Sequence, residues 1–150
     1  MKPSAELIEF LASWEGPASF VPREDPCAPG VFDVGYGHLC KFDHATITPS
    51  QALDLLASDV ERAAKTVDRL VLVSLTQNQY DAIVSLVYNI GVAAFERSTM
   101  LKYLNNSDFD FAANEFQKWN KAGGKIIGGL IRRRAAERAM FVFRKYDQLP

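Results

Sequence analysis

The chain has 150 residues, of which 48% are hydrophobic and 23% charged, a balance typical of one globular domain with its own core. A formal net charge of −1 provides no overall attraction to nucleic acid, and no apolar run reaches the length of about 18 residues that a membrane-spanning helix needs. The N-terminal residues lack the basic start and continuous apolar stretch of a signal peptide, so we expect none in this chain.

The first predicted element is a short helix from Ser4 to Trp14, in which Ser4 is the expected cap. Gly16 and Pro17 oppose its continuation. Residues 18–42 then contain several prolines and glycines between short apolar runs. This pattern predicts turns and a small β-hairpin region.

From Thr48 onward the sequence predicts helices. Thr48 and Gln51 form a capping-box pattern with Pro49 at the first helical position. One apolar stripe follows on this helix, made of Leu53, Leu56, Val60, Ala63 and Val67. A second capping box, Thr76 to Gln79, opens another helix, and Gly91 is expected to stop it.

Three further helices are expected in the last third. Ser98 caps one that reaches Leu104, and Ser107 or Asp108 starts the next. Two glycine pairs, at 123–124 and 128–129, interrupt the pattern before a final helix over 131–143. The layout predicts an α+β fold: one domain over 1–150, with an N-terminal helix and β-lobe over about 1–47, a helical lobe over about 48–146, and a cleft between them.

Glu15 is the first candidate for chemistry. Cleavage of a glycosidic bond needs a carboxylic acid that stays protonated, and a second group across the sugar. Glu15 follows the apolar Trp14 at a helix C-terminus, where both apolar surroundings and the helix dipole disfavour the charged form. A solvated glutamate at a helix end is the alternative interpretation.

Three acidic residues are candidates for the second group: Glu24, Asp25 and Asp33. Asp25 precedes Pro26, a common turn element, so a purely structural role also fits it. Asp33 lies in a predicted strand, where aspartate is depleted, and this favours a functional role.

The segment Gly35-Tyr36-Gly37-His38 follows two residues after Asp33. Its glycines indicate a strand that passes close to other groups. For His38, a structural hydrogen bond is favoured over direct catalysis, because a single histidine more often has that role.

Cys27 and Cys40 bracket the hairpin region. We expect no metal site, because a structural zinc site takes four ligands and the chain has only two histidines, His38 and His44. A Cys27–Cys40 disulfide is one hypothesis, worth on the order of 3 kcal/mol in an oxidising compartment. Two reduced thiols are the alternative.

Taken in order, these segments resemble the phage-type lysozymes, the endolysins of glycoside hydrolase family 24. The resemblance covers about residues 4–143. The segments that carry it are Glu15-Gly16, Asp25-Pro26, Gly30 to His38, Leu75 to Ala82, Asn89-Ile90-Gly91, Trp119, Gly123-Gly124 and Gly129 to Glu137.

The resemblance implies a muramidase that cuts the β-1,4 bond between N-acetylmuramic acid and N-acetylglucosamine in peptidoglycan. It also implies a catalytic Glu, Asp-or-Cys and Thr set. Glu15 matches the glutamate, and Asp25 is the preferred second member. Counting forward from Glu15 selects Glu24 as the second member instead, and counting back from Gly30 selects Cys27. Asp33 stands where the family has threonine.

We therefore expect Glu15 to be the general acid, with Asp25 and Asp33 positioning or activating water or stabilising the oxocarbenium-like transition state. Tyr36 and His38 are expected to line the cleft or support the catalytic groups. The basic cluster Arg132 to Arg134 either faces the anionic wall or packs structurally. A lytic transglycosylase and a catalytically silent wall-binding domain are the rival functions.

The expected partner is bacterial peptidoglycan, with no cofactor, no nucleic acid and no membrane insertion. We expect a monomer that acts in the periplasm or on the cell wall after delivery by a holin, a virion or a secretion system. In a bacterial effector, an immunity protein or inhibitor would be a further partner.

Overall fold

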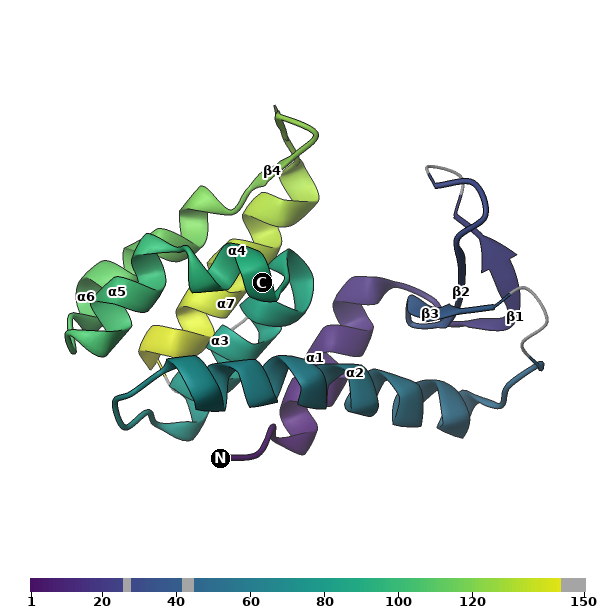
Figure 1. The fold of residues 1–150 in the computed structure, drawn as a ribbon, viewed down its shortest axis with the longest axis horizontal. Coiled ribbons are helices and arrows are strands. Elements are labelled where there is room, and N and C mark those ends of the chain that lie inside the picture. The colour runs from purple at the N-terminus through teal and green to yellow at the C-terminus, as the bar shows by residue number, and fades with distance from the viewer. Residues whose placement is uncertain (26–27, 42–44, 144–150) are drawn as a thin grey trace. The chain divides into compact units, whose positions relative to one another are not determined.

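The computed structural model describes residues 1–25, 28–41 and 45–143, and Figure 1 shows the order of their elements. Their contacts form two compact units. The N-terminal unit is Ala5–Glu61, and the C-terminal unit combines Met1–Ser4 with the chain from Arg62 onward. The sequence had placed this division near residue 47. Within the described ranges, no helix is both long and apolar enough to cross a bilayer.

The N-terminal unit starts with helix α1, Ala5–Glu15, which confirms the predicted first helix. Leu7 and Leu11 are completely buried, as their helical spacing predicts. Gly16 ends the helix with a φ of 77°, a left-handed conformation that favours glycine. The chain then enters the sheet.

The sheet has three antiparallel strands in the order β1-β2-β3: Ser19–Glu24, Phe32–Gly35 and His38–Cys40. The expected hairpin region is therefore a three-stranded sheet. The pairing of β1 with β2 is irregular between Ser19 and Arg23, the stretch that contains Pro22. Proline has no N–H to donate, so edge strands and bulges are where sheets accept it.

Val34, Ile47 and Ala52 form a small core in this unit, with Tyr36 and Cys40 packed against it. The Ile47 N–H also donates to the Phe20 carbonyl at 2.9 Å, which bonds the chain after the sheet to strand β1. This core therefore holds the sheet to the start of the next helix.

That helix, α2, is Pro49–Leu70, and the predicted capping box is confirmed. The Gln51 N–H donates to Thr48 Oγ1 at 3.2 Å, and the Thr48 N–H donates to Gln51 Oε1 at 2.8 Å. The predicted apolar stripe is wrong at Leu53, which is 42% exposed, whereas Ala52 is completely buried. Contact with Val34 and Ile47 selects the smaller side chain for the buried face.

In the C-terminal unit, helix α3 is almost entirely buried from Tyr80 to Val87. Its capping box, Thr76 with Gln79, and its end at Gly91 are both as predicted. Ser98 caps α5 by accepting the Leu101 N–H at 3.1 Å, also as predicted. The elements after α2 are α3 Gln77–Ile90, α4 Val92–Glu96, α5 Thr99–Asn105, α6 Phe109–Glu115, the 3₁₀ helix η1 Phe116–Lys118, β4 Lys121–Ala122, β5 Lys125–Ile126 and α7 Gly128–Phe143.

Three details of this unit differ from the predictions. A short helix, α4, follows Gly91 directly, and strands β4 and β5 pair around Gly123 and Gly124. Helix α7 begins at Gly128, three residues before the predicted start at Ile131. The first N–H groups of a helix have no intrahelical partner, so glycines cost less there than in a helix interior.

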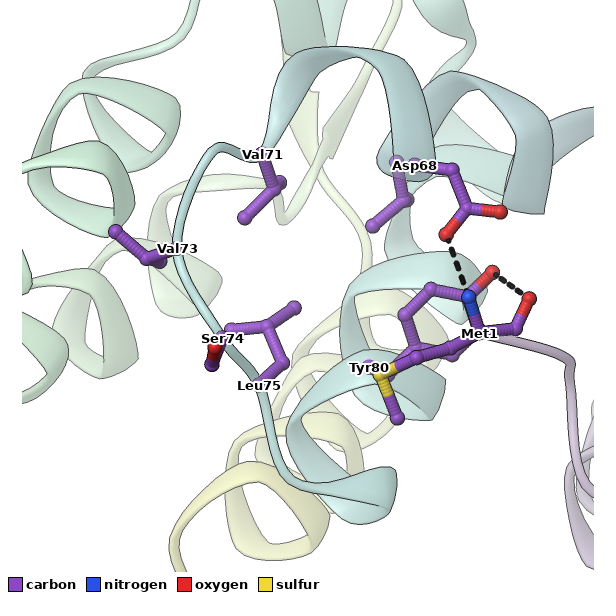
Figure 2. A pocket seen from close by; sticks show the side chains of 8 residues that line it. Met1, Asp68, Val71, Val73, Ser74, Leu75 and Tyr80 are labelled. Atoms are coloured by element: carbon purple, nitrogen blue, oxygen red, sulfur yellow. Dashed lines mark hydrogen bonds and ion pairs between the residues drawn. The ribbon is translucent and has the colours of Figure 1, made fainter.

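The first four residues pack onto α3. Asp81 is completely buried and accepts hydrogen bonds from the Ser4 N–H and from Gln77 Nε2, at 3.2 and 3.0 Å. The Met1 ammonium lies 3.1 Å from Asp68 Oδ1 and the Tyr80 hydroxyl donates to the Met1 carbonyl, beside a cavity of about 260 Å³ shown in Figure 2. Burial raises the pKa of Tyr80 well above its usual range, and Asp68 and Asp81 add to the rise.

Candidate active site

Glu15 is the last residue of α1 and is half-buried. The rings of Phe10 and of Trp14, which directly precedes Glu15, meet edge to face with centroids 6.0 Å apart. Gly16 then turns the chain toward β1. Glu15 thus stands at the junction between helix and sheet, next to an aromatic pair.

The loop after β1 contains two of the candidates. The Glu24 carboxylate accepts the Gly30 N–H at 2.7 Å, so it closes this loop. The Asp25 N–H donates to the Val31 carbonyl at 2.8 Å, which fixes the backbone at Asp25, and its side chain is half-buried. The bond to Gly30 gives the Glu24 carboxylate a structural role in this loop.

Asp33 lies on β2, directly opposite Arg23 on β1. The Arg23 Nε donates to Asp33 Oδ1 at 2.8 Å, and the Asp33 side chain is 18% exposed. The guanidinium binds one carboxylate oxygen and orients the group. Asp33 is therefore a fixed carboxylate on the sheet, with one oxygen already engaged.

Tyr36 and His38 support the same sheet. Tyr36 is half-buried against the core of Val34, Ile47 and Ala52. The His38 Nδ1 lies 2.9 Å from Asp59 Oδ2 and 3.1 Å from Oδ1. A carboxylate only accepts, so Nδ1 carries the proton in this bond.

Cys40 is half-buried on β3 and forms no disulfide with another described residue. Burial raises the pKa of the Cys40 thiol, and the negative charge of Asp33 raises it further. Cys27 lies outside the described residues, so the Cys27–Cys40 disulfide remains a prediction. Across residues 1–25, 28–41 and 45–143, no cluster of three or more His, Cys, Asp or Glu side chains could hold a metal ion.

The sequence left two interpretations of the basic cluster Arg132 to Arg134: contact with the anionic wall or structural packing. Structural packing applies to two of the three arginines. Arg134 is completely buried and Arg133 is 5% exposed, and both donate to the completely buried Glu137, at 2.8 and 3.3 Å. Burial raises the pKa of Glu137, while the two guanidinium groups oppose that rise. Arg132 is exposed.

Sequence reasoning missed Arg23 and Asp59, the partners of Asp33 and His38. A signal existed for Asp59, because it lies one turn from both Leu56 and Ala63 on the buried side of α2. An acidic residue on an apolar stripe indicates a buried partner. Arg23 carried no comparable signal, since its contact depends on the strand register.

The candidate carboxylates Glu15, Asp25 and Asp33 all belong to the N-terminal unit. They come from its helix end, its loop and its sheet. Such a set can supply one carboxylic acid that donates a proton. It can also supply one or more carboxylates that activate the attacking water or stabilise a cationic transition state, as glycoside hydrolysis requires.

Comparison with known proteins identifies the family. The phage lysozyme family model matches residues 12–137. The endolysin of Bacillus phage B103 is 42% identical over 144 residues, 95% of this chain and 54% of that protein. The endolysin of Salmonella phage P22 is 41% identical over 119 residues, 75% of this chain and 81% of that protein. The chain spans about half the length of the Bacillus phage endolysins that it matches.

Solved structures of phage lysozymes and related muramidases have the same fold as this chain. The endolysin of Escherichia coli O157:H7 phage FAHEc1 superposes with a TM-score of 0.84 at 31% identity, covering 97% of this chain and 96% of that one. The muramidase domain of SpmX from Asticaccaulis excentricus gives 0.83 at 33% identity, covering 94% and 97%. The α+β, lysozyme-like fold predicted from the sequence is therefore confirmed. The chain belongs to the phage lysozyme family.

Proposed function

We propose that this domain is a muramidase that hydrolyses the β-1,4 bond between N-acetylmuramic acid and N-acetylglucosamine in bacterial peptidoglycan. One observation carries the proposal: the phage lysozyme match extends from residue 12 to residue 137, a range that includes Glu15, Asp25 and Asp33. The endolysins among its relatives and the muramidase domain among its structural neighbours support it.

In this proposal, Glu15 is the general acid that protonates the glycosidic oxygen as the bond breaks. Asp25 activates or positions the attacking water, and Asp33 stabilises positive charge that develops on the sugar ring. The bond from Arg23 favours this division of roles, because it already occupies one oxygen of the Asp33 carboxylate, which is then less available to accept a hydrogen bond from the attacking water.

The cellular setting is part of the proposal. We propose that the domain acts as a monomer on the cell wall, which it reaches through a holin, a virion or a secretion system. The endolysin relatives from phages favour the phage routes. Sedimentation of the purified chain tests the monomer, and a dimer at micromolar concentration would contradict it.

The decisive experiment compares the clearing of purified peptidoglycan suspensions by the native chain and by Glu15→Gln, Asp25→Asn and Asp33→Asn. We expect at least a 100-fold loss for Glu15→Gln, since removing a general acid costs about 10²–10⁴ in rate. Asp25→Asn should lose nearly as much, and Asp33→Asn less. Glu9→Gln is the matched control, because Glu9 is an exposed glutamate on the same helix.

The products separate hydrolysis from its rival. Mass spectrometry of the digest should show reducing muramic acid ends, which carry the added water. Anhydromuramic ends would instead identify a transglycosylase. Retained clearing by Glu15→Gln, with an unchanged melting temperature, would contradict the assignment of Glu15.

A further inference from the structure

The cavity of about 260 Å³ beside Met1 belongs entirely to the C-terminal unit. The end of α2, the loop after it and the first turn of α3 form its walls together with Met1. A cavity needs only about 10–15 Å³ to hold one water molecule, so this one has room for a small organic molecule. None of its residues is a candidate for catalysis.

One side of the cavity is apolar. Val71, Val73 and Leu75 come from the loop, and Val67 comes from the last turn of α2. Figure 2 shows the three loop residues on one side and Asp68 with Met1 on the other. Apolar walls with a few polar groups are typical of sites for small molecules.

The loop that forms the apolar side is held in place from outside the cavity. The Leu72 N–H donates to Asn105 Oδ1 at 2.8 Å, and Asn105 Nδ2 donates to the Leu70 carbonyl at 3.0 Å. The Val71 N–H donates to the Val67 carbonyl at 2.9 Å. These bonds fix the loop to α5 and to α2, so the cavity is formed before any ligand arrives.

The other side of the cavity carries a carboxylate. Asp68 Oδ1 lies 3.1 Å from the Met1 ammonium, and the Asp68 side chain is 43% exposed. A carboxylate offers about four lone-pair positions on its two oxygens, so Asp68 can accept a further donor beside Met1. Ser74 is exposed as well. A ligand can therefore enter where Asp68 and Ser74 meet solvent.

The charges at this side favour a positively charged ligand. Asp68 and the completely buried Asp81 both raise the pKa of Tyr80, so the negative charge of each acts at the Tyr80 hydroxyl. The Met1 ammonium offsets one of these two charges. An anion would meet the remaining negative charge, whereas a cation would be attracted by it.

We propose that this cavity binds a small aliphatic ammonium ion. Its hydrocarbon stem packs against Val67, Val71 and Val73, and its ammonium group donates to the Asp68 carboxylate. This site is independent of the proposed function. The same chemistry occurs in a free alkylamine and in a lysine side chain of a peptide, and the two are separated by the choice of probe.

The test is a titration of the native chain followed by nuclear magnetic resonance at the methyl groups of Val71 and Val73. The probes are n-butylammonium, Nα-acetyl-lysine methylamide and, as the neutral control, 1-butanol. We expect saturable shifts with n-butylammonium and about 10-fold weaker binding of 1-butanol, which lacks the charge-assisted hydrogen bond to Asp68. Saturable shifts with the lysine derivative would identify a peptide side chain as a ligand, and shifts with n-butylammonium alone would identify a free amine.

Two substitutions test the two sides of the site. Asp68→Asn keeps the size of the side chain but removes its charge, so n-butylammonium should bind about 10-fold more weakly while 1-butanol binds as before. Asp54→Asn, at an exposed aspartate on the same helix, is the matched control and should bind like the native chain. Val73→Phe should fill the cavity from the loop side and abolish binding of every probe.

Three results would overturn the proposal. The first is equal affinity of the native chain for n-butylammonium and 1-butanol. The second is unchanged affinity for n-butylammonium in Asp68→Asn. The third is retained binding in Val73→Phe. Melting temperatures of both variants show that the chains compared are folded, because Asp68→Asn also removes the partner of the Met1 ammonium.

Discussion

The ring of His38 on β3 is bonded to Asp59 in the middle of α2, with 2.9 Å between Nδ1 and Oδ2. The two side chains are 22% and 12% exposed, so water competes only weakly for the bond. This contact joins the sheet to the helix beside it, within the N-terminal unit.

Replacing Asp59 by alanine should destabilise the chain. His38 loses its acceptor while it stays half-buried, and an unsatisfied buried donor costs about 1–3 kcal/mol. We expect the free energy of unfolding in urea to fall by roughly that amount. Asp54→Ala is the control, because Asp54 is an exposed aspartate on the same helix. Equal losses in the two variants would show that the bond to His38 is unimportant.

The capping box of α3 leads to a second prediction. Thr76 Oγ1 accepts the Gln79 N–H at 3.3 Å, and the Gln79 side chain accepts the Thr76 N–H at 3.0 Å. Thr76→Ala should lower the free energy of unfolding by about 1 kcal/mol, as loss of an N-cap typically does. Thr99→Ala, at an exposed position in the first turn of α5, should have no such effect. Thermal or urea unfolding measures both.

A third prediction concerns the thiol of Cys40, tested with Cys27→Ser so that only one thiol is present. Asp33 raises the pKa of Cys40, and burial raises it more. Removing the charge with Asp33→Asn should therefore lower the thiol pKa, though not to its ordinary value. At mildly alkaline pH the thiolate fraction rises, so Cys40 should react faster with a disulfide reagent. An unchanged rate would argue against the electrostatic contact, and Asp54→Asn is the matched control.

The buried phenol of Tyr80 predicts a pH dependence. Its pKa is raised in the folded chain, so the folded state holds this proton more tightly than the unfolded state does. The corresponding stability is fully present below the unfolded pKa of about 10 and is lost as the pH rises above it. Unfolding free energies measured across that range should fall less steeply for Tyr80→Phe. Parallel curves for the two chains would contradict this prediction.

The features that the sequence predicted well are local. Both capping boxes, the Ser98 cap and the end of α3 at Gly91 each depend on residues within one turn of one another. The β4–β5 hairpin and the early start of α7 were missed, because glycine pairs there indicate only an interruption and packing decides which structure forms.

In the candidate site, too, the sequence predicted individual residues better than the contacts between them. Glu15, Asp25 and Asp33 could be selected from residue type and order along the chain. Their partners could not, because the Arg23–Asp33 pair depends on a strand register with an irregularity beside it, and the His38–Asp59 bond joins residues 21 apart. Likewise, composition alone could not distinguish buried Arg133 and Arg134 from exposed Arg132.

The grouping of Met1–Ser4 with the chain from Arg62 onward makes the N-terminal unit an insertion within the other unit. No single proteolytic cut can release both units as complete fragments. During synthesis, the residues that bond Asp81 and Gln77 are made before α3, so these bonds can form only after α3 has been synthesised. The candidate carboxylates Glu15, Asp25 and Asp33 therefore lie, in chain order, between two parts of a helical unit that is completed only after they are synthesised.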